Sequence, residues 1–160
     1  MIIYYIFMGL AFALICTSVF PEFNYMNGWH WLEKTCYVTF GLSFLLNVLM
    51  AVSDPGCLEK DPSIDFVQLV ADFECNSLCP ICKVIKTPRT KHCPLCNKCI
   101  DRMDHHCPWV NNCVGRGNIK RFYAFIIVQF LYLVAALSAC IVYLTMQFSG
   151  EKHLPEGTEA

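Results

Sequence analysis

Apolar and charged residues along this chain fall into long blocks, not into the short periods that are typical of a soluble domain. No charged residue occurs at positions 1–21, 35–53 or 122–150, and these runs are 21, 19 and 29 residues long. An α-helix rises about 1.5 Å per residue, so about 20 apolar residues cross the hydrocarbon core of a bilayer. The pattern therefore predicts three transmembrane helices, at 1–21, 35–53 and 122–148.

Composition argues against two other interpretations of these runs. The three runs are not helices buried in a soluble core, and the first run is not a cleaved signal peptide. The chain is 56% hydrophobic and only 16% charged, so too little polar chain remains to cover three helices buried in a soluble core. A cleaved signal peptide would need a positive first region and a cleavage site of small residues. Residues 1–20 contain no Lys or Arg, and the stretch TSVFPEF is a poor cleavage site. We therefore interpret the first run as a membrane helix.

The distribution of basic residues predicts the orientation. Ten of the twelve Lys and Arg lie at 54–121, whereas the loop 22–34 carries only Lys34 and the tail 149–160 carries only Lys152. The positive-inside rule therefore places 54–121 in the cytosol. The N-terminus is then also cytosolic, and the loop and the tail face the lumen or the exterior.

The segment 54–78 is predicted to be a cytosolic juxtamembrane connection. The turn sequence Asp54-Pro55-Gly56 ends the second helix. A short amphipathic helix follows in DPSIDFVQLVADFE, where Asp61 can cap the first turn and four apolar residues share one face: Phe66, Leu69, Val70 and Phe73. We expect this helix either to lie on the membrane surface or to pack on the neighbouring cytosolic domain.

Cysteine gives the segment 79–121 its chemistry. Eight of the twelve cysteines lie between 75 and 113, on the predicted cytosolic side, where thiols stay reduced. Their dense spacing therefore indicates metal binding or catalysis, not disulfides. The segment also has too little apolar material for a core, so a metal would have to supply its folding free energy. The predicted fold is an α-helical integral membrane protein with a cytosolic, zinc-stabilised, cysteine-rich domain of short hairpins and loops.

A count of ligands suggests that this domain holds more than metal. Seven Cys and three His lie between 79 and 113, in the stretches CPIC, HCPLC, NKC, DHHC and NNC. Two four-coordinate zinc ions would use eight of these ten residues. If each ion takes three Cys and one His, one Cys and one His remain, which is the pair that a thiol nucleophile and its base require. The count alone leaves open which Cys and which His are spare.

The net charge of the chain hides a local basic excess. Residues 79–121 carry nine Lys and Arg against two acids, Asp101 and Asp104, which gives a net charge of +7. Such a patch can attract nucleic acid, acidic phospholipid or a phosphorylated cofactor. Its position between two membrane helices favours the last two, and nucleic acid is not expected as a partner.

The full spacing resembles that of the DHHC-type protein S-acyltransferases, or palmitoyltransferases. The pattern Cys-x2-Cys-x9-His-Cys-x2-Cys-x2-Cys-x4-Asp-His-His-Cys-x5-Cys runs from Cys79 to Cys113, and Asn118-x3-Phe122 follows it. The turn at 54–56 is also typical of the family, so the resemblance covers about 54–122. It implies two structural zinc ions. The implied ligands of the first are Cys79, Cys82, His92 and Cys99. The implied ligands of the second are Cys93, Cys96, His106 and Cys113.

The resemblance also implies the reaction. Cys107 would be the nucleophile, His105 its base, and Asp104 the group that orients His105. Cys107 would take a long-chain acyl group from acyl-CoA, such as palmitoyl-CoA, and pass it to a cysteine thiol of a substrate protein at the cytosolic membrane face. Each step exchanges one thioester for another, so no energy source is needed and ping-pong kinetics are expected. The Golgi or endoplasmic reticulum membrane is the location that the family implies.

The acyl-CoA donor is expected to bind in two places. A palmitoyl chain left in water would forfeit on the order of 10 kcal/mol, so it should lie among the helices. The CoA phosphates should stay in the basic segment, where the candidate contacts are Arg89, Lys91, Arg116, Lys120 and Arg121. For any one of these residues, simple anchoring at the inner membrane face is the stronger explanation. The resemblance places Phe122, Phe125 and Tyr132 along the acyl cavity, and ordinary helix packing is the alternative. Trp109 is expected at the membrane interface.

The chain departs from the family pattern after its third hydrophobic run. Family members usually have at least four transmembrane helices, followed by a Thr-Thr-x-Glu element, and the stretch GTEA at 157–160 is not that element. We therefore expect a truncated product, a short isoform or a fragment. A second hypothesis stands beside the enzyme: a non-catalytic, zinc-bearing membrane adaptor that binds family members or their substrates.

Overall fold

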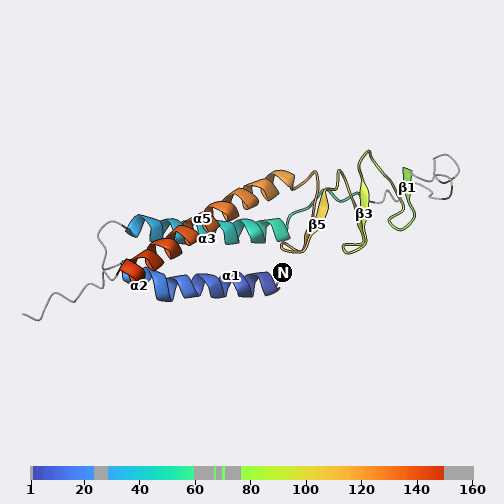
Figure 1. Ribbon diagram of the computed structural model, residues 1–160. Helices are drawn as coiled ribbons and strands as arrows, with labels where there is room; N and C mark the ends of the chain where they lie inside the picture. Colours follow the sequence, from blue (N-terminus) through green and yellow to red (C-terminus); the bar gives the residue numbers. More distant parts are fainter. Residues whose placement is uncertain (1, 24–28, 60–66, 68–69, 71–76, 150–160) are drawn as a thin grey trace, which may run out of the picture. The chain divides into compact units, whose positions relative to one another are not determined.

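The computed structural model describes residues 2–23, 29–59, 67, 70 and 77–149 (Figure 1). Within it, three helices are long and apolar enough to cross a membrane: Ile2–Phe23, His30–Ala51 and Ile119–Ser149. These confirm the three predicted spans. The chain divides into two compact units, which are described separately below. The amphipathic helix predicted within 61–74 lies outside the described residues except for Val67 and Val70, and so does the tail from 150 onward.

The helices extend beyond the charge-free runs that predicted them. Helix α3 (His30–Ala51) begins five residues before the run at 35–53, and α5 (Ile119–Ser149) begins three residues before the run at 122–150. The added turns carry polar and charged residues, including Lys34 and Lys120. A charge-free run marks the part of a helix that crosses hydrocarbon, whereas the helix itself continues into the headgroup region.

The first unit, Ile2–Phe44 and Ile126 onward, is helical. Helix α1 (Ile2–Leu14) passes through a π-helical segment η1 (Ile15–Val19) into the short α2 (Phe20–Phe23). The core of this unit joins this first span to α3 and α5, and its buried residues are Val19, Phe20, Phe23, Leu32, Cys36, Ala135 and Ala139. Many large apolar side chains face outward instead, as expected where lipid is the solvent.

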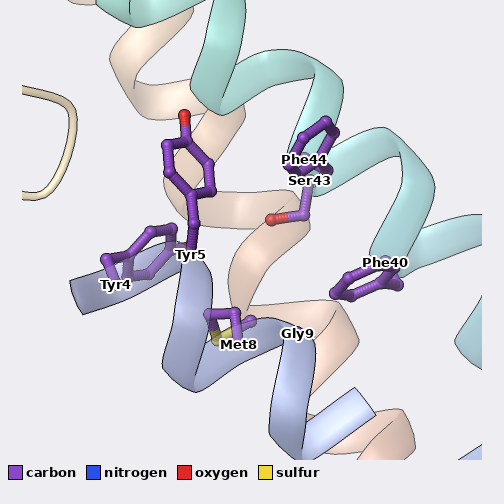
Figure 2. Close-up of a pocket in the computed structure, with 7 residues that line it drawn as sticks. All are labelled: Tyr4, Tyr5, Met8, Gly9, Phe40, Ser43 and Phe44. Carbon is purple, nitrogen blue, oxygen red and sulfur yellow. The ribbon is translucent and has the colours of Figure 1, made fainter. Parts of the chain in front are cut away.

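A cavity of about 170 Å³ lies between α1 and α3 in the same unit (Figure 2). Its lining residues are Tyr4, Tyr5, Met8, Gly9, Phe40, Ser43 and Phe44. The hydroxyls of Tyr4 and Ser43 donate to Oε1 of Gln129 on α5, at 2.9 and 2.5 Å. Polar groups in hydrocarbon pair with one another, so these two bonds tie the three helices together.

The described residues of the second unit, Leu45–Phe125, form six short strands in three antiparallel hairpins, of which β1, β3 and β5 are labelled in Figure 1. The first hairpin pairs β1 (Leu78–Cys79) with β2 (Val84–Ile85), and the second pairs β3 (Lys91–Cys93) with β4 (Lys98–Ile100). The third pairs β5 (His105–Cys107) with β6 (Asn112–Val114). These strands of two or three residues confirm the prediction of a cysteine-rich domain of short hairpins.

The three hairpins repeat one pattern with a period of 14 residues. Cys79, Cys93 and Cys107 each end the first strand, are each followed by Pro, and each lie 14 residues from the next. Their partners are Val84, Lys98 and Asn112, so the register is the same in all three hairpins. Each turn also contains a residue with a positive φ at the same position: 54° at Lys83, 52° at Asn97 and 50° at Asn111. The Cys-x-x-Cys motifs alone do not reveal this repeat, because position 110 is Val.

The turn after α3 packs tightly against the hairpins and against the start of α5. The backbone N–H of Asp101 donates to the carbonyl of Gly56, and that of Gly117 donates to the carbonyl of Pro55, at 2.8 and 3.1 Å. A Cβ atom on Gly117 would lie only 2.5 Å from the carbonyl oxygen of Asp54. Glycine is therefore required here for two backbone segments to approach each other closely.

Candidate active site and metal clusters

Two groups of three Cys and one His converge within the hairpin unit. The first group is Cys79, Cys82, His92 and Cys99, and the second is Cys93, Cys96, His106 and Cys113. Within each group the ligand atoms all lie within 4.8 Å of one another. The structure therefore brings together the same two sets of four residues that the family resemblance implied.

The spacing within each cluster fits a tetrahedral zinc ion. Nδ1 of His92 lies 3.7, 3.2 and 3.9 Å from Sγ of Cys79, Cys82 and Cys99. In the second cluster, Nδ1 of His106 lies 3.7, 3.4 and 3.6 Å from the sulfurs of Cys93, Cys96 and Cys113. Zn–S bonds of 2.3 Å and Zn–N bonds of 2.0–2.1 Å would place nitrogen and sulfur about 3.6 Å apart on a tetrahedron. Both clusters could hold a metal ion, and their donors are consistent with zinc.

Each cluster takes its ligands from two successive hairpins. The turn of one hairpin supplies two sulfurs, such as Cys79 and Cys82, and the strands of the next supply one His and one Cys. His92 pairs directly with Cys99 across the second hairpin, and His106 pairs with Cys113 across the third. Directly paired residues project from the same face of a hairpin, so each pair can reach one ion.

The pKa shifts differ among the sulfurs of each cluster. Burial raises the pKa of Cys79, but hydrogen bonds from the backbone N–H of Cys82 and the thiol of Cys99 lower it overall. Burial raises the pKa of Cys99, and the neighbouring sulfurs raise it further. The second cluster repeats this difference, with a lowered pKa at Cys93 and a raised pKa at Cys113. A bound metal would stabilise all the sulfurs as thiolates, with release of protons.

Cys107 belongs to neither cluster. Successive side chains of a strand point to opposite faces, so His106 faces the second cluster while His105 and Cys107 face the other way. Cys107 is 4% exposed and lies in an apolar cluster whose other buried members are Met50, Val110, Val114 and Phe125. The third hairpin thus presents an unligated thiol to the ends of α3 and α5.

His105 is held by its neighbours on two sides. Its Nδ1 lies 2.8 Å from Oδ2 of Asp104, which leaves Nε2 for proton transfer. The edge of its ring faces Phe122, with the ring centroids 5.3 Å apart. The His105 side chain is 41% exposed, so its ring is accessible from the surface. The structure thus pairs Asp104 with His105, whereas the roles of orienting carboxylate, base and nucleophile for Asp104, His105 and Cys107 stay predictions.

The side chain of Asn112 attaches the third hairpin to α3, a role that sequence reasoning missed. Asn112 pairs with Cys107 across the hairpin, and its amide nitrogen donates to the carbonyls of Met50 and Ser53, at 3.0 and 2.7 Å. Carbonyls at the end of a helix lack partners within the helix, so this side chain satisfies them. The 14-residue repeat could have predicted that Asn112 pairs with Cys107, but not its bonds to Met50 and Ser53.

Asn118 fixes the start of α5. It is 1% exposed, and its amide nitrogen donates to Oγ of Ser53 and to the carbonyl of Cys113, at 3.0 and 2.9 Å. Its Oδ1 accepts the backbone N–H of Gly115 at 3.0 Å. In the sequence this residue stood out only as part of a family motif, whereas its hydrogen bonds join the third hairpin to the segment after α3 and to the segment before α5.

The residues predicted to contact acyl-CoA fall into an exposed group and a more buried aromatic group. Trp109 and the five basic candidates are all exposed: Arg89, Lys91, Arg116, Lys120 and Arg121. Arg116 already has a partner, because its guanidinium lies 3.1 Å from Oδ2 of Asp101. Hydrogen bonds from the hydroxyl of Thr87 and from Arg116 lower the pKa of Asp101. Contact of these basic residues with CoA stays a prediction.

The three aromatic candidates of α5 are more enclosed. Phe125 and Tyr132 are each 3% exposed, and Phe122 is half-buried. Phe122 and Phe125 pack in the apolar cluster of Cys107, whereas Tyr132 packs on Phe40 in the other unit, with ring centroids 5.4 Å apart. None of the three lines the cavity of Figure 2, so their role in an acyl cavity remains a prediction.

Comparison with known proteins adds one positive finding. A family model described as DHHC palmitoyltransferase matches residues 72–157, which is more than half of the 160 residues. The matched range includes both Cys₃His clusters, the Asp104–Cys107 stretch and all of α5. No curated protein matches the chain.

Proposed function

Because this chain belongs to the DHHC palmitoyltransferase family, we propose that it is a membrane-bound protein S-acyltransferase that carries a long-chain acyl group on Cys107. One observation carries the proposal. Among the described cysteines of the three hairpins, Cys107 joins neither metal cluster; His105 lies two residues before it on β5, and Asp104, which contacts His105, directly precedes that strand. A zinc-bound thiolate is occupied, whereas a free thiolate can attack a carbonyl carbon.

The reaction would run in two balanced steps. His105 takes the proton of Cys107, whose sulfur attacks the acyl-CoA carbonyl carbon; the bond to the CoA sulfur breaks, and His105 returns the proton to the CoA thiolate. In the second step His105 takes the proton of a substrate-protein thiol, which attacks the acyl-enzyme carbonyl. Cys107 leaves and recovers its proton. Asp104 would hold the His105 ring in place and stabilise its charged form in both steps.

The two Cys₃His clusters would hold zinc ions with a structural role. Four-coordinate zinc has no open position for a substrate, so the ions would act only by fixing the hairpins. The second cluster is the more important for the reaction, because His106 and Cys113 flank Cys107 and its partner Asn112. Metal binding at these two residues would set the position of the nucleophile.

The apolar cluster around Cys107 supports a long-chain acyl donor. The thioester and its acyl chain would be removed from water if they packed against Met50, Phe122 and Phe125. Each methylene removed from water contributes about 0.8 kcal/mol, so a long chain gains much of its affinity there. The exposed basic residues would meet the CoA phosphates on the cytosolic side, and the acceptors would be proteins with cysteines close to that membrane face.

We expect the hairpins to face the cytosol, with the Golgi or endoplasmic reticulum as the location. The basic residues concentrated at 54–121 support this orientation through the positive-inside rule. In sealed microsomes, protease added outside should cleave within 54–118 but should spare the loop 22–34 until detergent opens the vesicles. Cleavage of that loop in sealed vesicles would reverse the proposed orientation.

The burial of Cys107 is the observation that favours the alternative, a non-catalytic membrane adaptor. A thiol that is 4% exposed can serve as a small apolar packing residue. An adaptor would need both metal clusters for its fold but no reactive sulfur.

Labelling with palmitoyl-CoA separates the two functions. The purified full chain in detergent is incubated with radiolabelled palmitoyl-CoA, and label is measured before and after treatment with hydroxylamine, which cleaves thioesters. We expect label that hydroxylamine releases, that Cys107→Ser abolishes, and that Cys57→Ser retains, because Cys57 lies in neither cluster. A chain that contains two zinc ions and stays unlabelled would be the adaptor.

A further inference from the structure

The third hairpin has the form of a metal-binding turn, yet it contributes only one cysteine. In the first two hairpins, the residue that ends the first strand and the residue three positions later are both metal-cluster cysteines: Cys79 with Cys82, and Cys93 with Cys96. The 14-residue repeat aligns Cys107 with the first cysteine of each pair and Val110 with the second. The turns match in register and in the position of the positive φ.

The strand next to this turn already carries the other parts of a metal site. His105 and Cys107 project from the same face of β5, because they are two residues apart. Asp104 accepts a hydrogen bond from Nδ1 of His105 at 2.8 Å, as carboxylates do behind many metal-bound histidines. One more sulfur at position 110 would complete a set of three protein ligands, which is enough for an open zinc site.

We propose that Val110 is a positioning residue that keeps Cys107 from becoming a metal ligand, an inference that rests on the proposed role of Cys107 as the nucleophile. Val110 is fully buried and packs in the same apolar cluster as Cys107. Its side chain takes the place that the second sulfur holds in the first two turns. Cys107 then has no sulfur partner three residues away, and an ion held by Cys107 and His105 alone lacks the third protein ligand that an open zinc site requires.

The substitution Val110→Cys tests this inference on the reduced full chain in detergent. We expect Val110→Cys to bind one metal ion more than the unmodified chain when Zn²⁺ is added. Co²⁺ in place of Zn²⁺ should give additional thiolate–metal absorption, which the double substitution with Cys107→Ser should remove. Added Zn²⁺ should also abolish palmitoyl labelling of Val110→Cys, while the unmodified chain stays labelled.

Two control variants test whether Val110 prevents metal binding by Cys107 or only fills space in the apolar cluster. Val110→Ser has nearly the size of the cysteine variant but does not retain zinc, so it should bind no extra ion, and Zn²⁺ should not change its labelling. Trp109→Cys places a thiol at an exposed neighbouring position and should also bind no extra ion. If Val110→Cys does not fold, Val110→His supplies a different ligand at the same position with the same expectation.

The results distinguish this inference from the proposed function. If neither Val110→Cys nor Val110→His gains an ion, or if Trp109→Cys gains one equally well, the inference is wrong. It is also wrong if Val110→Ser loses labelling to the same extent as zinc-treated Val110→Cys. Failure of the unmodified chain to label would instead overturn the proposed function, and the metal measurements would still decide the role of Val110.

Discussion

At the scale of single residues, the direction of each side chain decides its chemistry. His105 and His106 are adjacent and identical, yet strand alternation turns one toward Asp104 and Phe122 and the other toward the second metal cluster. Cys107 follows His105 to the first of these two faces. A change of one residue in the register of this strand would exchange the base with the metal ligand.

Asp104 is the residue whose contribution can be tested most directly. Asp104→Asn keeps the size of the side chain but removes the charge that stabilises a protonated His105. We expect acyl-enzyme formation to slow by at least about tenfold, since a positioned general base contributes typically 10²–10⁴-fold. Stopped reactions with labelled palmitoyl-CoA would measure this rate.

Asp101→Asn is a matched control for that substitution. Asp101 pairs with Arg116 and Thr87, outside the Asp104–Cys107 stretch, so its replacement should leave the labelling rate nearly unchanged. If Asp104→Asn and Asp101→Asn slow acyl-enzyme formation equally while both metal ions are retained, Asp104 contributes only a nearby negative charge and does not orient His105.

At the scale of elements, close backbone contacts join the turn after α3 to the hairpins and to the segment before α5. The turn at 54–56 meets the segment before α5 at Gly115 and Gly117, where a Cβ atom would lie 2.5 Å from backbone oxygens of Pro55 and Asp54 respectively. Backbone atoms cannot move aside as a flexible side chain can. The amides of Asn112 and Asn118 then satisfy polar groups at the end of α3 and before α5.

Gly117→Ala should therefore weaken the hairpin unit strongly. We expect the free energy of unfolding to fall by a few kcal/mol, as is typical where a core site is overpacked against atoms that cannot yield. Gly41→Ala is the control, because a Cβ atom there meets nothing within 4 Å and Ala favours a helix more than Gly does. Thermal unfolding of both variants in the same detergent would measure the difference, and equal stability would contradict the close packing.

At the scale of the whole molecule, the two units depend on different forces. The helical unit buries an apolar core and exposes apolar side chains that suit lipid. Between successive hairpins the buried clusters consist largely of the ligand cysteines themselves, such as Cys79 with Cys99 and Cys93 with Cys113. The first unit should therefore be stable without metal, and the hairpins should not.

Removal of metal should unfold the hairpins and leave the helices folded. A chelator that strips both clusters should make 77–114 sensitive to protease while the helical circular dichroism signal persists. Structural zinc contributes roughly 10–16 kcal/mol in small domains, which is as large as the whole stability of a typical domain. Restoring Zn²⁺ should restore protection. Hairpins that resist protease in the stripped chain would show that metal does not hold this fold.

The sequence by itself determined the features that depend on local composition. Charge-free runs predicted the three spans, because crossing hydrocarbon requires length and low polarity and nothing else. The ten candidate ligands predicted a metal-stabilised domain, and their number implied one spare Cys and one spare His. The helix ends were less well predicted, because helices continue past the charge-free run into polar surroundings.

Only the tertiary structure shows why eight of the candidate ligands form two metal clusters while Cys107 and His105 are left out of both. The family resemblance implied Cys107 as the spare sulfur, but the ligand count could not, since it treats all sulfurs alike. Each cluster joins the turn of one hairpin to the strands of the next, and among the described residues no hairpin follows the third one. Such pairing between separate hairpins is non-local, and it leaves Cys107 beside Val110 and the helix ends instead of beside a second sulfur.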